Sequence, residues 1–216
     1  MKTSKVTVLG AGIVGICCAI ELQRRGYQVE LIDRKGPGEE TSSGNAGILS
    51  LSSIAPLASP ELLTRLPRLA SNLDADFLLH YPHLPGLLPW LMRFLVRCKR
   101  SKYIADGLLI NALTVPSVAT HMELIKASEA QQLVNSSGSL RLYRNIKTYQ
   151  RDELERELFD LCDLQYSIIE KREIRDLEPD IANIFSKAVL IKNSISITNP
   201  ESLCQCYARY FQQLGG

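Results

Sequence analysis

Three glycines near the N-terminus have the spacing of a phosphate-binding turn. They lie in the stretch Gly10-Ala-Gly-Ile-Val-Gly15, which has the pattern G-x-G-x-x-G. Gly10 permits a tight turn, Gly12 removes the side chain that would hold a pyrophosphate away, and Gly15 lets a helix pack closely on a strand. The amides near Ile13 and Val14 are then expected to face an anion at the positive end of the helix dipole. The pattern predicts binding of a dinucleotide through its diphosphate.

The segments around the turn have the patterns of the elements that must position it. Residues 5–9 form a β-branched run of the kind that is buried in a parallel sheet. Residues 13–25 repeat apolar side chains at helical spacing, and Gly26 follows where a helix C-terminus favours a left-handed residue. A second strand is expected at residues 28–33. The order of strand, glycine turn, helix and strand is that of a dinucleotide-binding unit.

Asp33 supplies the fourth feature of such a unit. It lies 23 positions after Gly10, at the end of the second expected strand. A carboxylate there can accept hydrogen bonds from both ribose hydroxyls of an adenosine, and it repels a 2′-phosphate. The sequence therefore disfavours NADP but leaves NAD and FAD open.

The next segment favours FAD. It reads Arg34-Lys-Gly-Pro-Gly-Glu-Glu-Thr-Ser-Ser-Gly-Asn-Ala-Gly47, in which three consecutive hydroxyl residues precede four small ones. Thr and Ser are good helix caps, and small residues let the backbone approach a flat ring or a phosphate closely. An NAD-dependent dehydrogenase would keep the glycine turn but give this segment no role, and composition alone would also allow a flexible polar loop.

The two stretches VLGAGIVG and ELIDRKGPGEETSSGNAGILS resemble the FAD-dependent D-amino acid dehydrogenases of the glycine oxidase and D-amino acid oxidase superfamily. The resemblance is strong to Ser50 and weaker through the rest of the chain. It implies an α/β fold in which a Rossmann-like FAD-binding domain of the glutathione-reductase type, here incomplete, carries an inserted α+β substrate domain. It also implies FAD contacts from the pyrophosphate turn, the adenosine end and the flavin side, namely Gly10, Ala11, Gly12, Ile13, Val14, Gly15, Asp33, Arg34, Thr41, Ser42, Asn45, Ala46 and Gly47.

The expected domain organisation follows from that resemblance. Residues 1–55 are expected to form the first segment of the FAD-binding domain, residues 56–194 a helical and then α+β substrate domain, and residues 195–216 a return to the FAD-binding domain. Residues 60–134 have a helical pattern that we expect to be interrupted at four prolines, Pro82, Pro85, Pro89 and Pro116. Strands are expected at 140–143, 166–169 and 188–191, a charged helix near 151–162, and a helix at 199–214 that starts at Pro200.

Members of this family are considerably longer, and their substrate-clamping residues lie largely beyond the part that this chain resembles. No catalytic residue can therefore be assigned. We expect the chain to be the N-terminal portion of an enzyme, which a complementing C-terminal half would complete. Isolated, it should retain flavin weakly, because apolar surfaces meant for the missing half would be exposed.

A basic amphipathic pattern occurs at residues 87–102. Arg93, Arg97 and Arg100 follow one another at helical spacing, while Leu87, Leu91, Phe94, Leu95 and Cys98 lie largely on the other side. Such a helix could lie on an anionic membrane with Trp90 at the interface, or it could bury its apolar face in the protein. The resemblance implies peripheral association with the inner face of the cell membrane and electron transfer toward the respiratory chain.

Composition excludes several other classes. The formal net charge of the 216 residues is only +2, so a nucleic-acid partner is not expected. The six cysteines form no CxxC pair and are expected to be reduced packing residues in a cytoplasmic protein.

A metal site is not expected, because Pro82 separates His80 from His83 and a third ligand is lacking. Glycines interrupt the apolar N-terminus, which disfavours a secretory signal, and no later run of about 18 apolar residues suggests a spanning helix.

The resulting hypothesis is an FAD-dependent oxidoreductase that oxidises the CH–NH2 group of a D-amino acid. The α-hydrogen leaves as hydride to the flavin, and the imine hydrolyses to a 2-oxo acid and ammonia. Two alternatives stay open at this point. One is a related enzyme that oxidises glycine, sarcosine or proline derivatives, and the other is a catalytically inactive chain that only binds the nucleotide.

Overall fold

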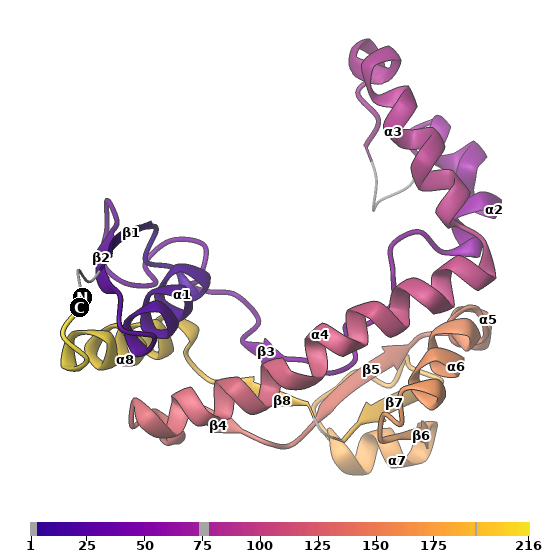
Figure 1. The fold of residues 1–216 in the computed structure, drawn as a ribbon. Helices are drawn as coiled ribbons and strands as arrows, with labels where there is room; N and C mark the ends of the chain where they lie inside the picture. The colour runs from indigo at the N-terminus through magenta and orange to yellow at the C-terminus, as the bar shows by residue number, and fades with distance from the viewer. Residues whose placement is uncertain (1–3, 74–77, 193) are drawn as a thin grey trace. The chain divides into compact units, whose positions relative to one another are not determined.

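The computed structural model describes residues 4–73, 78–192 and 194–216. Contacts divide the chain into two compact units, each built from separate stretches of sequence. The first contains residues up to Ser50, Val115–Ser139 and Ile191–Gly216, and the second contains Leu51–Thr114 and Leu140–Leu190. The stretches of each unit can be located by residue number in Figure 1.

The first unit begins with the predicted strand, helix and strand. These are β1 (Lys5–Leu9), α1 (Ile13–Arg24) and β2 (Gln28–Ile32). The strands pair in parallel, with Val6 opposite Val29 and Val8 opposite Leu31. Gly26 has a φ of 85°, the left-handed conformation that was expected at the end of the helix. All three predicted elements are confirmed to within a residue at their ends.

Helix α8 (Pro200–Gln213) packs beside α1 and completes the core of this unit (Figure 1). The side chain of Asn199 caps the helix by accepting a hydrogen bond from the Ser202 amide at 2.9 Å. The α8 residues Tyr207 and Cys204 are fully buried, and they belong to one apolar cluster with Ile16 and Ile20 of α1. Burial of Cys17 raises the pKa of its thiol to about 12. All six cysteines are free, and Cys98, Cys204 and Cys206 are buried as expected of packing residues, whereas Cys18 is exposed.

A small antiparallel sheet lies in the same unit. Its order is β3 (Ile48–Leu49), β8 (Ile195–Ile197) and β4 (Val134–Asn135), and a short 3-10 helix, η2 (Gln131–Leu133), precedes β4. Ile48 pairs with Ser196 and Val134 with Ile197. This sheet holds the end of the segment that follows the nucleotide-binding strands, since β3 begins one residue after Gly47.

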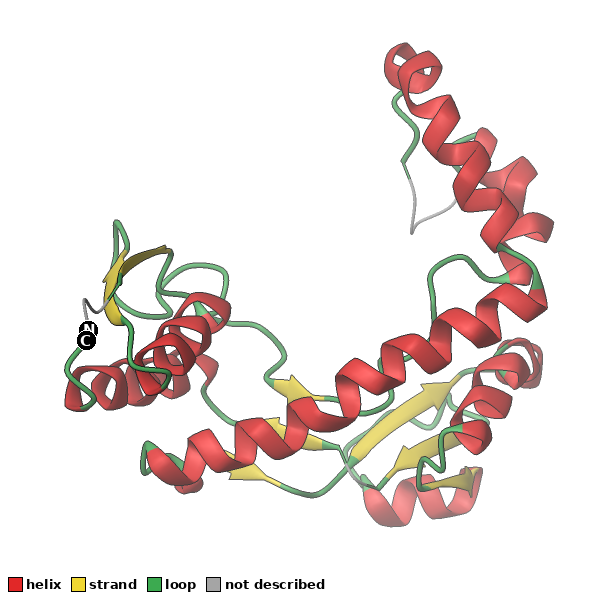
Figure 2. Cartoon of the chain, viewed as in Figure 1, coloured by secondary structure: helices red, strands yellow, loops and turns green. Residues whose placement is uncertain are grey.

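The second unit combines a helical part with a second sheet (Figure 2). The helical part comprises α2 (Pro60–Ala70), the 3-10 helix η1 (Tyr81–His83), α3 (Leu84–Arg97) and the first half of α4 (Arg100–Ala127). The sheet has the order β5 (Ser139–Tyr143), β7 (Lys187–Ile191) and β6 (Tyr166–Glu170). The remaining helices are α5 (Ile146–Arg151), α6 (Glu153–Leu161) and α7 (Lys171–Leu177). The three predicted strands and the charged helix are all present.

Two of the four expected proline breaks are wrong. Pro89 lies inside α3, and Pro116 lies inside α4, which runs unbroken for 28 residues (Figure 2). An internal proline removes one backbone hydrogen bond, but packing elsewhere along a helix can outweigh that loss. Tyr103 near one end of α4 is buried, as are Leu124 and Ile125 near the other. Helix α4 is also long and apolar enough to cross a membrane, by length and composition alone, which the sequence had not suggested.

The amphipathic segment at 87–102 is not one helix, because α3 ends at Arg97 and α4 starts at Arg100. The apolar residues Phe94, Leu95 and Cys98 pack in a cluster with Leu62, Leu66 and Leu69 of α2. Leu88, Met92 and Val96 are exposed along one side of α3, and Trp90, which stacks on Phe94, is exposed on another side. Arg97 and Arg100 form ion pairs with Asp106 and Glu157. The predicted apolar face is therefore partly internal, and a different set of apolar side chains is exposed.

The compact units divide the chain differently from the expected domains at residues 115–139, and by four or five residues at the two other boundaries, 51–55 and 191–194. Residues 115–139 were assigned to the substrate domain, but their contacts place them in the unit that contains the glycine turn. The physical reason is that Leu124 and Ile125 pack in the same cluster as Ile16 and Tyr207.

Candidate cofactor site

The glycine turn joins β1 to α1 in a conformation that excludes side chains. Gly10 has a φ of 103°, and its amide donates to the Ile32 carbonyl at 2.8 Å. A Cβ atom on Gly15 would lie 1.8 Å from the Gly10 carbonyl oxygen, and one on Gly12 would lie 3.2 Å from the Ser42 hydroxyl. The backbone of the turn and the N-terminus of α1 therefore approach each other closely, as the glycine spacing predicted. No Cβ atom projects from Gly10, Gly12 or Gly15.

Asp33 lies against this turn. Its Oδ2 atom accepts a hydrogen bond from the Ala11 amide at 2.6 Å, and Oδ1 accepts one from the Lys35 amide at 3.0 Å. A carboxylate has about four lone-pair positions, so acceptor capacity for ribose hydroxyls is left after these two bonds. The Ala11 and Lys35 amides also hold the pKa of Asp33 below its usual value.

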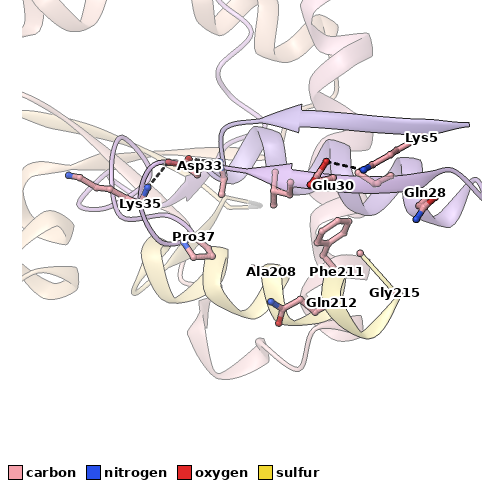
Figure 3. Close-up of a pocket in the computed structure, with 14 residues that line it drawn as sticks. Lys5, Gln28, Glu30, Asp33, Lys35, Pro37, Ala208, Phe211, Gln212 and Gly215 are labelled. Carbon is pink, nitrogen blue, oxygen red and sulfur yellow. Dashed lines mark hydrogen bonds and ion pairs between the residues drawn. The ribbon is translucent and has the colours of Figure 1, made fainter.

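A cavity of about 540 Å³ opens beside Asp33 (Figure 3). Strand β2 and helix α8 form its sides, with Ala208 and Phe211 contributed by α8. Lys35 and Pro37 line it as well, which the sequence reasoning missed, although the Pro37-Gly38 dipeptide is a turn signal. Arg34 points elsewhere, because its guanidinium pairs with Glu40 at 2.6 Å. The cavity extends from Asp33 along β2 to Lys5 and Gln28 at the amino ends of the strands, so an adenosine ribose would fit at its Asp33 end.

The segment 41–47 is tied to the start of α1 by Ser42. Ser42 is 6% exposed, and its Oγ atom accepts a hydrogen bond from the Ile13 amide at 3.0 Å. One of the two amides expected to face an anion is thus already bonded to a hydroxyl. Asn45 folds the segment by donating from Nδ2 to the Ser42 carbonyl at 3.0 Å and accepting the Gly47 amide on Oδ1 at 2.7 Å. Val14, Thr41 and Ala46 are exposed on the same unit.

Gly47 closes the segment onto the small sheet. It has a φ of 60°, and a Cβ atom there would lie 2.4 Å from the Ile197 carbonyl oxygen. Its own carbonyl accepts the Ile197 amide at 2.7 Å. Ser43 makes a further tie by donating to Glu201 of α8 at 2.7 Å. The segment is therefore an ordered part of this unit, rather than the flexible loop that composition also allowed.

His121 of α4 is the one histidine that this unit brings near the segment. It lines a cavity of about 170 Å³ together with Ser42, Asn45 and Gly47, and its Nδ1 atom lies 3.2 Å from the Tyr207 hydroxyl. Burial lowers its pKa, which favours the neutral ring. Nothing in the sequence pattern around residue 121 had signalled this position. His80 and His83 stack on each other at a ring-centroid distance of 4.9 Å in the other unit.

The residues that are present fit a dinucleotide with an unmodified ribose. The turn leaves backbone open, Asp33 retains acceptor capacity, and a cavity lies beside it. Residues 5–216 match the FAD dependent oxidoreductase family, designated DAO. This chain belongs to that family. FAD is thus the cofactor of the family, as the sequence predicted, and the α/β fold expected from the resemblance is confirmed.

Relatives of the chain in this family include amino acid dehydrogenases and oxidases. D-amino acid dehydrogenase 2 of Ralstonia nicotianae is 37% identical over 148 residues, which are 67% of this chain and 35% of that protein. D-amino-acid oxidase of Bradyrhizobium diazoefficiens is 27% identical over 213 residues, which are 95% of this chain and 49% of that protein. The chain thus spans half or less of the length of these relatives.

Solved structures of the family share the fold. Glycine oxidase from Geobacillus kaustophilus matches with a TM-score of 0.61 at 18% identity, over 99% of this chain and 46% of that one. L-α-glycerophosphate oxidase from Mycoplasma pneumoniae, solved with FAD bound, matches with a TM-score of 0.56 at 18% identity, over 99% of this chain and 44% of that one. At this identity the likeness shows the fold alone.

The carboxylate of Asp33 gives a pH-dependent prediction. Because its pKa is lowered in the folded chain, its bonds to Ala11 and Lys35 stabilise the fold above the unfolded value of about 3.8 and lose that effect as the pH falls through the folded value. The variant Asp33→Asn is therefore expected to melt below the wild type at pH 7, with the difference shrinking below pH 4. Thermal unfolding followed by circular dichroism from pH 7 to 3 measures this.

Glu39→Gln is the matched control for that experiment. It removes the carboxylate of Glu39, which is exposed in the same loop and forms no ion pair within the described residues. Its melting difference from the wild type should stay near zero at every pH. An Asp33→Asn difference that does not change with pH would show that the two amide bonds do not lower the pKa of Asp33.

Proposed function

We propose that the chain is the FAD-binding N-terminal portion of an enzyme that oxidises D-amino acids to 2-oxo acids and ammonia. The observation that carries the proposal is the 37% identity to a D-amino acid dehydrogenase over 148 residues, a much closer likeness than the chain has to the solved structures of the family. When bound, the flavin accepts the hydride from the substrate α-carbon.

The residues of this chain would hold the cofactor rather than the substrate. The turn from Gly10 to Gly15 would hold the diphosphate, Asp33 the adenosine ribose, and the segment from Thr41 to Gly47 the flavin side. Ser42 positions the start of α1 relative to that segment through its bond to Ile13. Substrate contacts, including a guanidinium for the substrate carboxylate, would come from polypeptide outside these 216 residues.

A complementing polypeptide is part of this proposal. Within the described residues the sheet of β1 and β2 has two strands, so both of its edges are unpaired there. Leu9 is 80% exposed and its cross-strand partner Ile32 is 46% exposed, so the carboxyl end of the sheet presents apolar surface. A partner that covers this surface would stabilise the unit and increase flavin retention.

Co-expression tests the activity. The chain is produced together with the C-terminal part of the Ralstonia nicotianae relative that lies beyond the matched 148 residues. We expect a yellow complex that reduces an artificial electron acceptor with D-alanine but not with L-alanine, and that releases pyruvate. A flavin-loaded complex that turns over glycine or sarcosine and no D-amino acid would favour the related amine oxidases instead.

We further propose peripheral membrane contact through the exposed side of α3. Leu88 is 50% exposed and Met92 and Val96 are each 56% exposed, at four-residue spacing along one side of α3. Trp90, which stacks on Phe94 on another side of the helix, is 55% exposed. Arg68, Arg93 and Lys99 form no ion pair within the described residues and could contact anionic lipid. Localisation at the inner face of the cell membrane and electron transfer to the respiratory chain are proposed on the same basis.

Vesicle sedimentation tests the membrane contact. The chain is expected to sediment with vesicles of phosphatidylglycerol at low salt, and the double variant Trp90→Ser, Met92→Ser should not. Failure of the wild type to bind at any salt concentration would contradict the proposal.

A further inference from the structure

His121 has no role in the proposed function so far, although it lies beside the segment that would hold the flavin side. It lines the cavity of about 170 Å³ together with Ser42, Asn45 and Gly47. All lining residues belong to the first unit, so the geometry of the cavity is internal to that unit. The others are small or apolar and come from the start of α1, the small sheet and α8, namely Ile13, Ile48, Leu49, Ile197, Pro200, Leu203 and Cys204.

The fully buried Tyr207 of α8 holds the His121 ring in place. The Tyr207 hydroxyl donates to the His121 carbonyl oxygen at 3.2 Å, and its oxygen lies 3.2 Å from Nδ1 of the ring. Because a phenol has one proton, Nδ1 supplies the proton for the second contact. The neutral imidazole therefore carries its proton on Nδ1 and has an acceptor at Nε2. Within the described residues this Nε2 atom has no hydrogen-bond partner.

Asn45 offers the cavity a donor that complements this acceptor. Its Nδ2 atom donates one N–H to the Ser42 carbonyl at 3.0 Å, and its Oδ1 atom accepts a hydrogen bond from the Gly47 amide. The second N–H of Nδ2 is left over. One acceptor and one donor among apolar side chains suit an occupant that carries neutral hydroxyl or amide groups.

The surroundings of His121 do not stabilise a protonated ring. None of the described residues that line the cavity is charged. The titratable groups of α8 beside the ring are Tyr207 and Cys204, and burial raises the pKa of both, so they stay neutral near pH 7. On α4 itself Glu123 and Lys126 are exposed, and burial is the cause that lowers the pKa of His121.

We propose that the neutral His121 ring contacts the uncharged flavin side of bound FAD, so that protonation of His121 and binding of FAD oppose each other. This contact rests on the proposed function, in which the segment from Thr41 to Gly47 holds the flavin side. The cavity has the volume of roughly six waters in the liquid, which admits a part of the cofactor. An occupant there removes water from the ring, and a charged imidazolium without a carboxylate partner is then costly.

The affinity for FAD should consequently depend on pH. It is expected to be constant above the ordinary His121 pKa of 6.5 and to fall as the pH drops through the lowered value. One proton is linked to binding, so the fall should reach about tenfold per pH unit at most. Asp33 stays ionised throughout, because its pKa is lowered from 3.8. Flavin fluorescence titration of the full chain from pH 8 to 5 measures the affinity.

Two histidine variants assign the pH dependence to this cavity. His121→Gln removes the titrating group and keeps a neutral polar side chain, so its FAD affinity should be the same at every pH. His83→Gln, which removes an exposed histidine of the other unit, should keep the pH dependence of the wild type. Circular dichroism verifies that each variant is folded over the range. A pH dependence that persists in folded His121→Gln would overturn the proposal.

Calorimetric titration with ADP-ribose separates the two halves of the cofactor. This ligand carries the adenosine and the diphosphate without a flavin, and its phosphates stay ionised over the range, so its affinity should not change with pH. An FAD affinity that is constant with pH in the wild type would overturn the role of His121 and leave the cofactor assignment intact. Failure of FAD to bind even at pH 8 would overturn the proposed function, and the role of His121 with it.

Discussion

The Gly15→Ala variant is expected to bind FAD about hundredfold or more weakly than the wild type, and its unfolding free energy should be about 3 kcal/mol lower. The added Cβ atom would lie 1.8 Å from the Gly10 carbonyl oxygen and 3.0 Å from its carbon. Both are backbone atoms of the turn, so no side-chain rotation relieves the contact. Either α1 or the turn must move, and the approach of backbone to the diphosphate is lost.

Flavin fluorescence titration measures the affinity of this variant, and urea unfolding measures its stability. The control is Gly86→Ala in α3, where an added Cβ atom meets no atom within 4 Å. Alanine is the better helix former, so that variant should gain about 0.5–1 kcal/mol and bind FAD as the wild type does. If Gly15→Ala binds FAD normally, the glycine turn is not the diphosphate site.

The Ser42→Ala variant is expected to show the second largest effect, about a tenfold loss of FAD affinity and about 1–3 kcal/mol of stability. The buried Ser42 hydroxyl accepts the Ile13 amide at 3.0 Å, and the Ser42 carbonyl accepts the Asn45 side chain. Removing the hydroxyl leaves the Ile13 amide without its partner and detaches the 41–47 segment from the start of α1.

The same two measurements apply to this variant, with Ser136→Ala as the control. Ser136 is exposed in the same unit and takes part in no hydrogen bond within the described residues, so its removal should change neither quantity. Ser42→Thr keeps the hydroxyl and should recover part of the affinity. Equal affinities of Ser42→Ala and wild type would mean that this hydroxyl does not position the cofactor segment.

The elements around the glycine turn could be predicted because local signals there agree. The β-branched strand, the helical spacing and Gly26 all report on backbone conformation within a few residues. The contact of Asp33 with Ala11 also follows from sequence, since the end of β2 lies beside the end of β1 in a parallel pair.

The structure differs from the predictions where distant packing decides. An internal proline interrupts most helices, but α4 contains Pro116 and continues past it, because buried residues hold the helix near both of its ends. The pairing of Arg97 with Asp106 and the packing of Phe94 on α2 depend on how helices meet, which hydrophobic spacing along one helix does not encode. The position of His121 beside Ser42 depends on the same kind of contact between remote segments.

Competition between ligands shows whether the turn and Asp33 hold the adenosine diphosphate half of FAD. FAD is titrated with the 216-residue chain while flavin fluorescence is followed, and the bound FAD is then challenged with ADP, NADP or riboflavin. We expect ADP to displace FAD, riboflavin to do so poorly, and NADP to fail because Asp33 repels its 2′-phosphate. Displacement by riboflavin but not by ADP, or by NADP as readily as by ADP, would show that the turn and Asp33 do not hold this half of the cofactor.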